Sequence, residues 1–238
     1  MKTNGVIHVL GLSCRPDQDE KFNKWYNEQH VPDLLKFNGL RRANRYKLVS
    51  EGKRYSGVAE AKYPGYLAVY ELDSKDSFEE YEASPEVAAA MMELRETWGN
   101  DPFERVWRVQ FQHLQRWGDA EPRRVINVLG NTCRPDQEEK YNRWLNKKHV
   151  PELLKFKSLK TVTRYCALYP GRIYSGYPEV TYPSYLMTCG FDSEQIFHEY
   201  EVSPIIEKAH KDYRETWQQD PYERIWRVQF KLIQTWKQ

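Results

Sequence analysis

The residues best suited to chemistry lie on one face of a predicted helix near the start of the chain. Asn23, Asn27, His30 and Leu34 recur at helical intervals, which places them on one side of an α-helix. A histidine on such a face can act as a general acid or base near neutral pH. The amides beside it could hold a polar substrate. Alternatively, the amides and the histidine bind loop backbone and only fix the end of the helix.

The same stripe occurs again 119 residues later (149 − 30 = 119), as Asn142, Asn146, His149 and Leu153. Trp25 and Trp144 flank the two copies and could contact the same ligand. Pro32 follows His30 closely and removes one helical hydrogen bond. We therefore expect the first helix to kink or break just after His30.

Two further sets of positions are candidate site residues. Arg45 and Arg164, each followed by a tyrosine on a predicted strand, could hold a carboxylate or enolate oxygen. The alternative is a salt bridge to Glu60 or to another acid. The other candidates lie in the long loop of each half and could donate hydrogen bonds to a substrate oxygen; they are Tyr55, Ser56, Tyr174 and Ser175.

The whole chain is repeated at this spacing. Residues 5–119 align without a gap with residues 124–238, and blocks such as CRPDQ, LLKF and WRVQF occur once in each half. The sequence predicts two domains, 1–119 and 120–238, with one topology. The linker of a few residues near Gly118 to Arg123 is too short to hold the domains apart, so we expect them to pack on each other.

Each repeat has the pattern of a β-α-β-β-α-β unit. In the first, strands are expected over 6–13, 40–49, 65–72 and 104–117, with helices after Pro16, from Ser74 to Tyr81 and from Ser84 to Trp98. One face of such an antiparallel sheet stays bare. The fold class is therefore α+β: two ferredoxin-like repeats packed sheet to sheet through a pseudo-twofold axis as an α/β barrel.

Composition limits the partners. Charged residues make up 29% of the 238 residues and the net charge is only +2, which does not favour nucleic-acid binding. No apolar run approaches 18 residues, so a membrane partner is not expected. Aromatic residues reach 14% and either fill two small cores or line a pocket for a flat ligand. The expected partner is a small aromatic molecule, and further homodimerisation stays open.

The four cysteines and six histidines show no metal-ligand spacing, so neither a metal nor a cofactor is expected. Without paired or clustered cysteines, the chain is typical of a cytoplasmic protein with reduced thiols.

The helix motif resembles that of a known group. Trp25, His30-Val31-Pro32 and Leu34, followed by Gly39-Leu40 and Arg45-Tyr46, are similar to the dimeric α/β-barrel superfamily and, within it, to EthD-like proteins. The motif spans about 25 residues in each half, and the second half departs from it because Ser158 replaces the glycine. The superfamily hosts cofactor-free monooxygenases, polyketide cyclases, dehydratases, isomerases and haem enzymes, so the resemblance implies the fold more closely than any one activity.

Three functions remain open. The first is a cofactor-independent acid–base enzyme of the cyclase, dehydratase, isomerase or monooxygenase type, acting on a small aromatic or polyketide-like molecule. In this reading His30 and His149 would move protons, and Arg45 and Arg164 would stabilise negative charge. The second is a non-catalytic protein that binds a hydrophobic ligand or haem. The third is an accessory protein whose interior is filled by its own side chains. A cavity beside the histidines would favour the first.

Overall fold

The computed structural model describes residues 5–49, 62–99, 103–217 and 222–238. Both halves carry the same order of elements. The elements of the first half are β1 (Val6–Ser13), η1 (Pro16–Gln18), α1 (Asp19–Trp25), η2 (Tyr26–His30), α2 (Val31–Leu34), β2 (Leu40–Leu48), β3 (Tyr66–Leu72), α3 (Lys75–Glu82), α4 (Pro85–Trp98) and β4 (Glu104–Gly118). Those of the second half are β5 (Val125–Thr132), η3 (Pro135–Gln137), α5 (Glu138–Trp144), η4 (Leu145–His149), α6 (Val150–Leu153), β6 (Thr161–Ala167), β7 (Tyr185–Phe191), α7 (Glu194–Glu201), α8 (Pro204–Trp217) and β8 (Glu223–Lys237).

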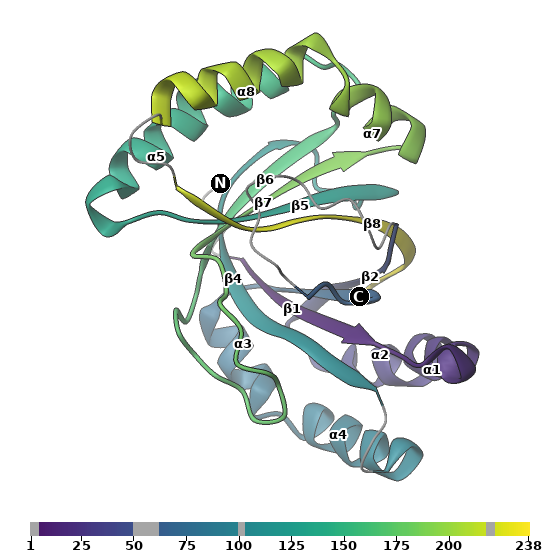
Figure 1. Cartoon of the computed structure of the whole chain (residues 1–238). Helices are drawn as coiled ribbons and strands as arrows, with labels where there is room; N and C mark the ends of the chain where they lie inside the picture. Colours follow the sequence, from purple (N-terminus) through teal and green to yellow (C-terminus); the bar gives the residue numbers. More distant parts are fainter. Residues whose placement is uncertain (1–4, 50–61, 100–102, 218–221) are drawn as a thin grey trace.

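The strands form one closed antiparallel barrel in the order β1-β3-β2-β8-β5-β7-β6-β4. The halves join at two equivalent seams, where β2 pairs with β8 and β4 pairs with β6. At these seams Ala43 lies opposite Trp236, and Arg164 lies opposite Gln115. The helices of the first half cover one side of the barrel and those of the second half the other (Figure 1). The expected pseudo-dimeric α/β barrel within one chain is therefore present, and closure leaves no exposed sheet edge.

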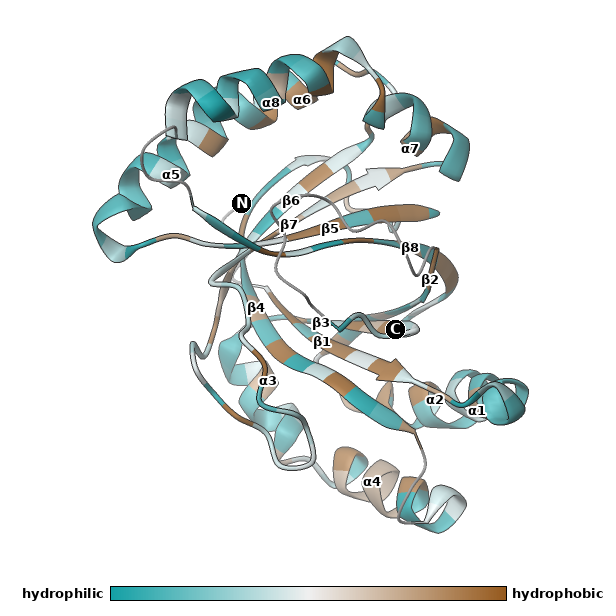
Figure 2. Ribbon diagram, in the orientation of Figure 1, coloured by the Kyte–Doolittle hydropathy of each residue, from teal (hydrophilic) through white to brown (hydrophobic). Residues whose placement is uncertain are grey.

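Local sequence explains the element boundaries. Ser74 and Ser84 accept hydrogen bonds from the backbone N–H groups of Ser77 and Val87, so each caps the helix that follows. Pro85 occupies the first turn of α4, where a missing N–H costs no hydrogen bond. Along β4, hydrophobic and hydrophilic residues alternate because successive side chains point to opposite faces (Figure 2).

Of the kink or break expected after His30, the break is absent. Residues 26–30 form a π-helical turn, and Val31 and Pro32 continue in helical conformation. The backbone N–H of Val31 reaches the carbonyl of Tyr26, five residues earlier. The wider turn thus absorbs the hydrogen bond that Pro32 cannot make, and the helix continues without a break. The second half repeats this arrangement at Leu145–His149.

Three apolar layers hold the molecule together. The middle layer fills the barrel, where Trp107 and Trp226, one from each half, stack with ring centroids 3.9 Å apart. The outer layers lie between sheet and helices. In the first half this layer is one continuous cluster, whereas in the second half it is split into two. A cavity lined by residues of both of these clusters lies in the second half.

The segment between β6 and β7 crosses from the second half onto the first. The Tyr169 hydroxyl donates to Glu79 (2.7 Å), and Arg172 donates to Glu82 (3.0 Å). The Tyr182 hydroxyl accepts a hydrogen bond from the backbone N–H of Arg108 (3.0 Å). The reciprocal contact joins the Tyr63 hydroxyl to the backbone N–H of Arg227 (3.2 Å). A tyrosine hydroxyl of each half therefore binds a strand of the other half.

Tyr182→Phe is expected to lower the free energy of unfolding by about 1–2 kcal/mol, because it leaves the Arg108 N–H without its acceptor. Urea denaturation measures the loss. Tyr169→Phe is the matched control, since it removes a hydroxyl whose partner lies at the surface and should change stability little. Equal stabilities of the wild type and Tyr182→Phe would contradict the importance of this tie between the halves.

Within the described residues, no helix is both long and apolar enough to cross a membrane. All four cysteines are free thiols.

Candidate active site

A cavity of about 340 Å3 lies in the second half between the sheet and the helices η4, α7 and α8. We call it the second-half cavity. Its floor comes from β5 and β8, and its apolar lining includes Leu129 and Ile206. Its polar lining includes His149, Glu201, His210, Tyr213, Arg214, Arg224 and Arg227. A volume of this size accommodates a small organic ligand.

Positive charge dominates the cavity lining. Arg214, Arg224 and Arg227 face it, against the single carboxylate of Glu201. Arg224 is fixed by the side chains of Asn131 (3.2 Å) and Tyr222 (3.3 Å), neither of which neutralises its charge. Arg227 lies 3.6 Å from Glu201. The surplus of cations favours an anionic ligand, or an intermediate that becomes anionic.

His149 lines this cavity, and one of its ring nitrogens has no hydrogen-bond partner. This atom, Nδ1, is buried. The ring stacks on Trp144 with centroids 4.5 Å apart, which fixes its orientation. Burial, followed by the charges of Arg224 and His210, lowers the pKa of His149 to about 3. Burial, with the nearby arginines, also lowers the pKa of His210. His149 is therefore neutral at pH 7 and able to accept or share a proton with a ligand.

The two halves differ where α8 and β8 line the cavity. His210, Tyr213 and Tyr222 replace residues that are Met91, Leu94 and Phe103 in the first half. These three first-half side chains pack into the continuous cluster between sheet and helices. At the equivalent positions of the second half, polar ring-bearing side chains line the cavity.

His30 occupies a different environment from His149. It is 3% exposed and stacks on Trp25, with centroids 4.7 Å apart. Burial is the main cause that lowers its pKa to about 4. Its Nδ1 also lacks a partner, and His30 does not line the second-half cavity. The cavity expected beside both histidines is thus found beside His149.

Arg45 and Arg164 are almost fully buried, at 1% and 2% exposure. Arg45 donates to the side-chain oxygens of Asn27 and Asn23 (3.1 Å for Asn23), and its guanidinium lies 4.2 Å from the Tyr26 ring. In the second half the same contacts join Arg164 to Asn146 and Asn142. The asparagine stripe therefore holds a buried arginine. These partners are amides, whereas the alternative we considered was an acid; Glu60 lies outside the described residues.

Arg45→Lys is expected to cost about 2 kcal/mol of folding stability, because lysine cannot reach both asparagine oxygens at once. Thermal and urea unfolding measure the loss. The surface variant Arg41→Lys, whose side chain is 72% exposed, is the control. If Arg45→Lys unfolded like the wild type, its contacts with Asn23 and Asn27 would not support the helix.

The remaining predicted site residues are spread over the molecule. The Trp25 indole donates to the Glu93 carboxylate (2.8 Å), while the buried indole nitrogen of Trp144 has no partner. Tyr174 lies over the first half and donates to Gln110 (2.5 Å), and Ser175 beside it is exposed. Tyr55 and Ser56 lie outside the described residues. Among the predicted site residues that the structure describes, only His149 lines the second-half cavity.

Sequence reasoning missed the rest of the cavity lining because it looked for residues retained in both halves. The positions that shape the cavity are those where the halves differ, such as His210 and Tyr213. A usable signal was present in the spacing. His210, Tyr213 and Arg214 lie at i, i+3 and i+4 on one helix face, where the first half has Met91 and Leu94.

A metal ion and a haem each need a particular set of side chains in the lining. No group of three or more His, Cys, Asp or Glu side chains among the described residues could hold a metal ion. A haem needs a wide apolar slot and an imidazole that can reach its iron. His149 has an unpartnered Nδ1, but its ring lies against Trp144 and the cavity carries three arginines and a glutamate. This lining does not fit a macrocycle.

Comparisons with known proteins place the fold. A family described as a domain of unknown function, DUF4286, matches residues 6–105, within the first half. No curated protein matches the chain. An anthrone oxidase-like protein superposes with a TM-score of 0.66 at 12% identity, covering 99% of this chain and 94% of the other.

Two further structures have similar shapes. A proposed monooxygenase from Fusobacterium nucleatum gives a TM-score of 0.64 at 7% identity, covering 100% of this chain and 96% of that one. A chlorite dismutase from Candidatus Nitrospira defluvii gives 0.55 at 8% identity, with coverages of 98% and 93%. These neighbours also carry both halves of the barrel in one chain. At such identities the likeness establishes the fold alone.

Proposed function

We propose that this chain, which has the fold of the dimeric α/β-barrel superfamily, is an acid–base enzyme that removes a proton from a small aromatic carbonyl compound. The reaction would take place in the second-half cavity. The observation that carries the proposal is the unpartnered Nδ1 of His149 beside a cavity lined by three arginines. A base next to cations is the arrangement needed to form and stabilise an enolate.

Different residues would remove the proton, stabilise the oxyanion and contact the substrate. His149 would accept the proton from the carbon next to the carbonyl group. Arg224, held in place by Asn131 and Tyr222, would stabilise the oxyanion that forms. Tyr213 and Tyr222, with the aliphatic side chains of the lining, would contact the flat faces of the substrate. The fixed orientation of these groups lowers the barrier because nothing has to reorganise as charge develops.

The low pKa of His149 is compatible with this role. Burial and the neighbouring cations disfavour the imidazolium while the cavity holds no anion. An enolate forming next to the ring adds negative charge, which stabilises the imidazolium and raises the pKa of His149. The base therefore becomes stronger as the proton moves, which keeps the imidazolium–enolate pair from being prohibitively costly.

Anthrone is a suitable probe, because its CH2 group is acidic and one structural neighbour is anthrone oxidase-like. In D2O under nitrogen, we expect the protein to accelerate exchange of the CH2 protons, as followed by NMR. The matched control is the double variant His210→Met/Tyr213→Leu, which restores the first-half residues and removes two polar side chains from the lining. Exchange at the buffer rate with wild-type protein, across anthrone and related hydroxylated anthrones, would contradict the proposal.

The alternative of haem binding makes a separate prediction. Because the lining does not fit a macrocycle, we expect the purified protein to be colourless and to give no Soret band after addition of hemin. Absorbance titration with hemin measures this. A stoichiometric Soret band that disappears in His149→Gln would favour the haem-binding alternative over proton abstraction.

A further inference from the structure

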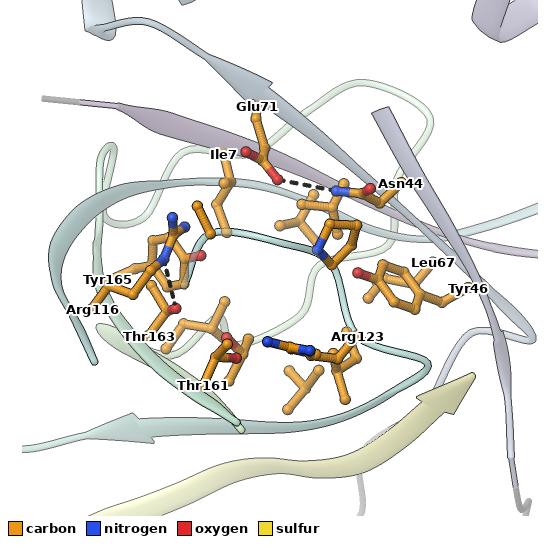
Figure 3. Close-up of a pocket in the computed structure, with 18 of the residues that line it drawn as sticks. Ile7, Asn44, Tyr46, Leu67, Glu71, Arg116, Arg123, Thr161, Thr163 and Tyr165 are labelled. Atoms are coloured by element: carbon orange, nitrogen blue, oxygen red, sulfur yellow. Dashed lines mark hydrogen bonds between the residues drawn. The ribbon is translucent and has the colours of Figure 1, made fainter. Parts of the chain in front are cut away.

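A second cavity of about 80 Å3 lies inside the barrel, beneath the linker that joins the halves. We call it the linker cavity. Both halves line it, and Figure 3 shows side chains from several strands pointing into it. Its walls are largely aliphatic and aromatic, including Val9, Val128, Trp107 and Trp226. Polar and charged groups gather at the end nearest the linker.

The carboxylates at this end are already neutralised. Glu71 accepts a hydrogen bond from Asn44 (3.0 Å) and lies 3.8 Å from Arg42. Glu121 lies 3.7 Å from Arg42 and 2.9 Å from Lys237. Neither carboxylate therefore needs a ligand cation.

The two arginines of the lining differ in their partners. Arg123 is paired with Asp119 and, at 3.1 Å, with Asp192. Arg116 donates from Nε to the Thr163 hydroxyl (3.2 Å), as Figure 3 shows. Among the described residues Arg116 forms no salt bridge, although its charge, after a backbone hydrogen bond, contributes to lowering the pKa of the Asp119 carboxyl. Arg116 is therefore the one cation of the lining, so far as the structure describes it, without an acidic partner.

This charge breaks the symmetry of the barrel. The equivalent of Arg116 in the second half is Thr235 (116 + 119 = 235), whose hydroxyl donates to Asn44 (3.0 Å). One side of the pseudo-twofold axis thus carries an unpaired guanidinium, whereas the other carries a satisfied hydroxyl. The polar end of the cavity also holds Glu71, Asp119 and Glu121, each with a cationic partner, so Arg116 is the group there that a small amphipathic monoanion would contact.

We propose that the linker cavity binds a small aliphatic monocarboxylate, with its carboxylate on Arg116 and its alkyl chain directed into the barrel. The size sets the chain length: a cavity of about 150 Å3 accepts benzene, so about 80 Å3 admits roughly two to four carbons. The site is separate from the second-half cavity, with which it shares no lining residue. The proposed carboxylate binding can therefore be tested independently of the proposed enzymatic activity.

The test uses the full chain and a series of acetate, propionate, butyrate and octanoate, with binding measured by saturation-transfer NMR and calorimetry. Propionate or butyrate is expected to bind most tightly, whereas octanoate and uncharged 1-propanol bind at least about tenfold more weakly. Arg116→Gln should lower the propionate affinity about tenfold or more, since a charge-assisted contact is lost. Thr163→Val, which keeps the charge but removes the hydroxyl that orients it, should give a smaller loss.

Two variants serve as controls. Arg143→Gln removes one surface arginine of the same charge, and Arg224→Gln removes one from the second-half cavity. Both should bind propionate like the wild type. Equal affinity of the wild type and Arg116→Gln would overturn the proposal. So would equal binding of propionate and 1-propanol, or loss of propionate binding in Arg224→Gln while Arg116→Gln retains it.

Discussion

Replacement of His149 by glutamine is expected to slow proton abstraction from a carbonyl substrate by about two to four orders of magnitude while leaving the fold intact. Glutamine is similar in size and still forms hydrogen bonds, but it cannot take up a proton. Because Nδ1 of His149 has no protein partner, the substitution breaks no hydrogen bond at that atom. The rate of deuterium exchange into anthrone measures the effect, and the melting temperature reports on the fold.

His30→Gln is the matched control for this variant. Both rings stack on a tryptophan and end the same kind of helical turn, but only His149 lines the second-half cavity. We expect His30→Gln to retain the exchange activity. Full activity in a folded His149→Gln variant would rule out this histidine as the base. Equal losses in both single variants, without loss of stability, would instead indicate two working sites.

This expected asymmetry differs from what the sequence suggested. The EthD-like motif is more complete in the first half, because the second half has Ser158 in place of the glycine. This position lies far along the chain from α8. His210 and Tyr213 belong to α8, and they line the second-half cavity. The geometry therefore favours the second half.

The fold could be predicted because its signals are local and occur twice. Strand alternation in Trp107, Val109 and Phe111, and the serine and proline at the start of α4, each determine one element. The gap-free offset then required a common topology, and a sheet with one bare face required a partner. The domain boundary at residues 119 and 120 stays a prediction, because the two halves share one barrel.

The candidate site could be predicted only in part, because a cavity depends on volume that distant side chains leave empty. The asparagine stripe was correctly placed on one helix face, but its partner, Arg45, comes from a strand and buries the amides beneath it. The spacing of Asn23 and Asn27 does not show whether the partner of their side-chain amides is a substrate or an arginine. Likewise, Pro32 indicated a break, whereas a π-helical turn accommodated it.

Acidification from pH 6.5 to pH 4 is expected to destabilise the protein strongly, because buried histidines must stay neutral in the native state. The unfolded chain binds a proton on each histidine near pH 6.5. In the native state burial lowers the pKa of His30 to about 4, an effect that Asp33 opposes and Arg45 reinforces. Burial also lowers the pKa of His149 to about 3 and that of His8 well below its usual value.

Between these values the unfolded state binds more protons than the native state, so stability rises with pH across this window and falls as pH drops through it. Each unit of pKa difference is worth about 1.4 kcal/mol, so His30 alone accounts for a loss of about 3 kcal/mol by pH 4. Above pH 6.5 all three imidazoles are neutral in both states, and this contribution no longer changes with pH. The loss below that pH is large because typical domains are stable by only about 5–15 kcal/mol.

Urea denaturation at half-unit steps from pH 7.5 to pH 4.5 measures the slope. His30→Gln should flatten it, because glutamine has no proton to gain on unfolding. His198→Gln, at a side chain that is 55% exposed, is the matched control and should keep the wild-type slope. The same slope in the wild type and His30→Gln would mean that His30 takes up its proton without unfolding. Since the Nδ1 of His30 has no partner and the ring is enclosed by Trp25 and Tyr26, the native state offers that proton no favourable acceptor arrangement.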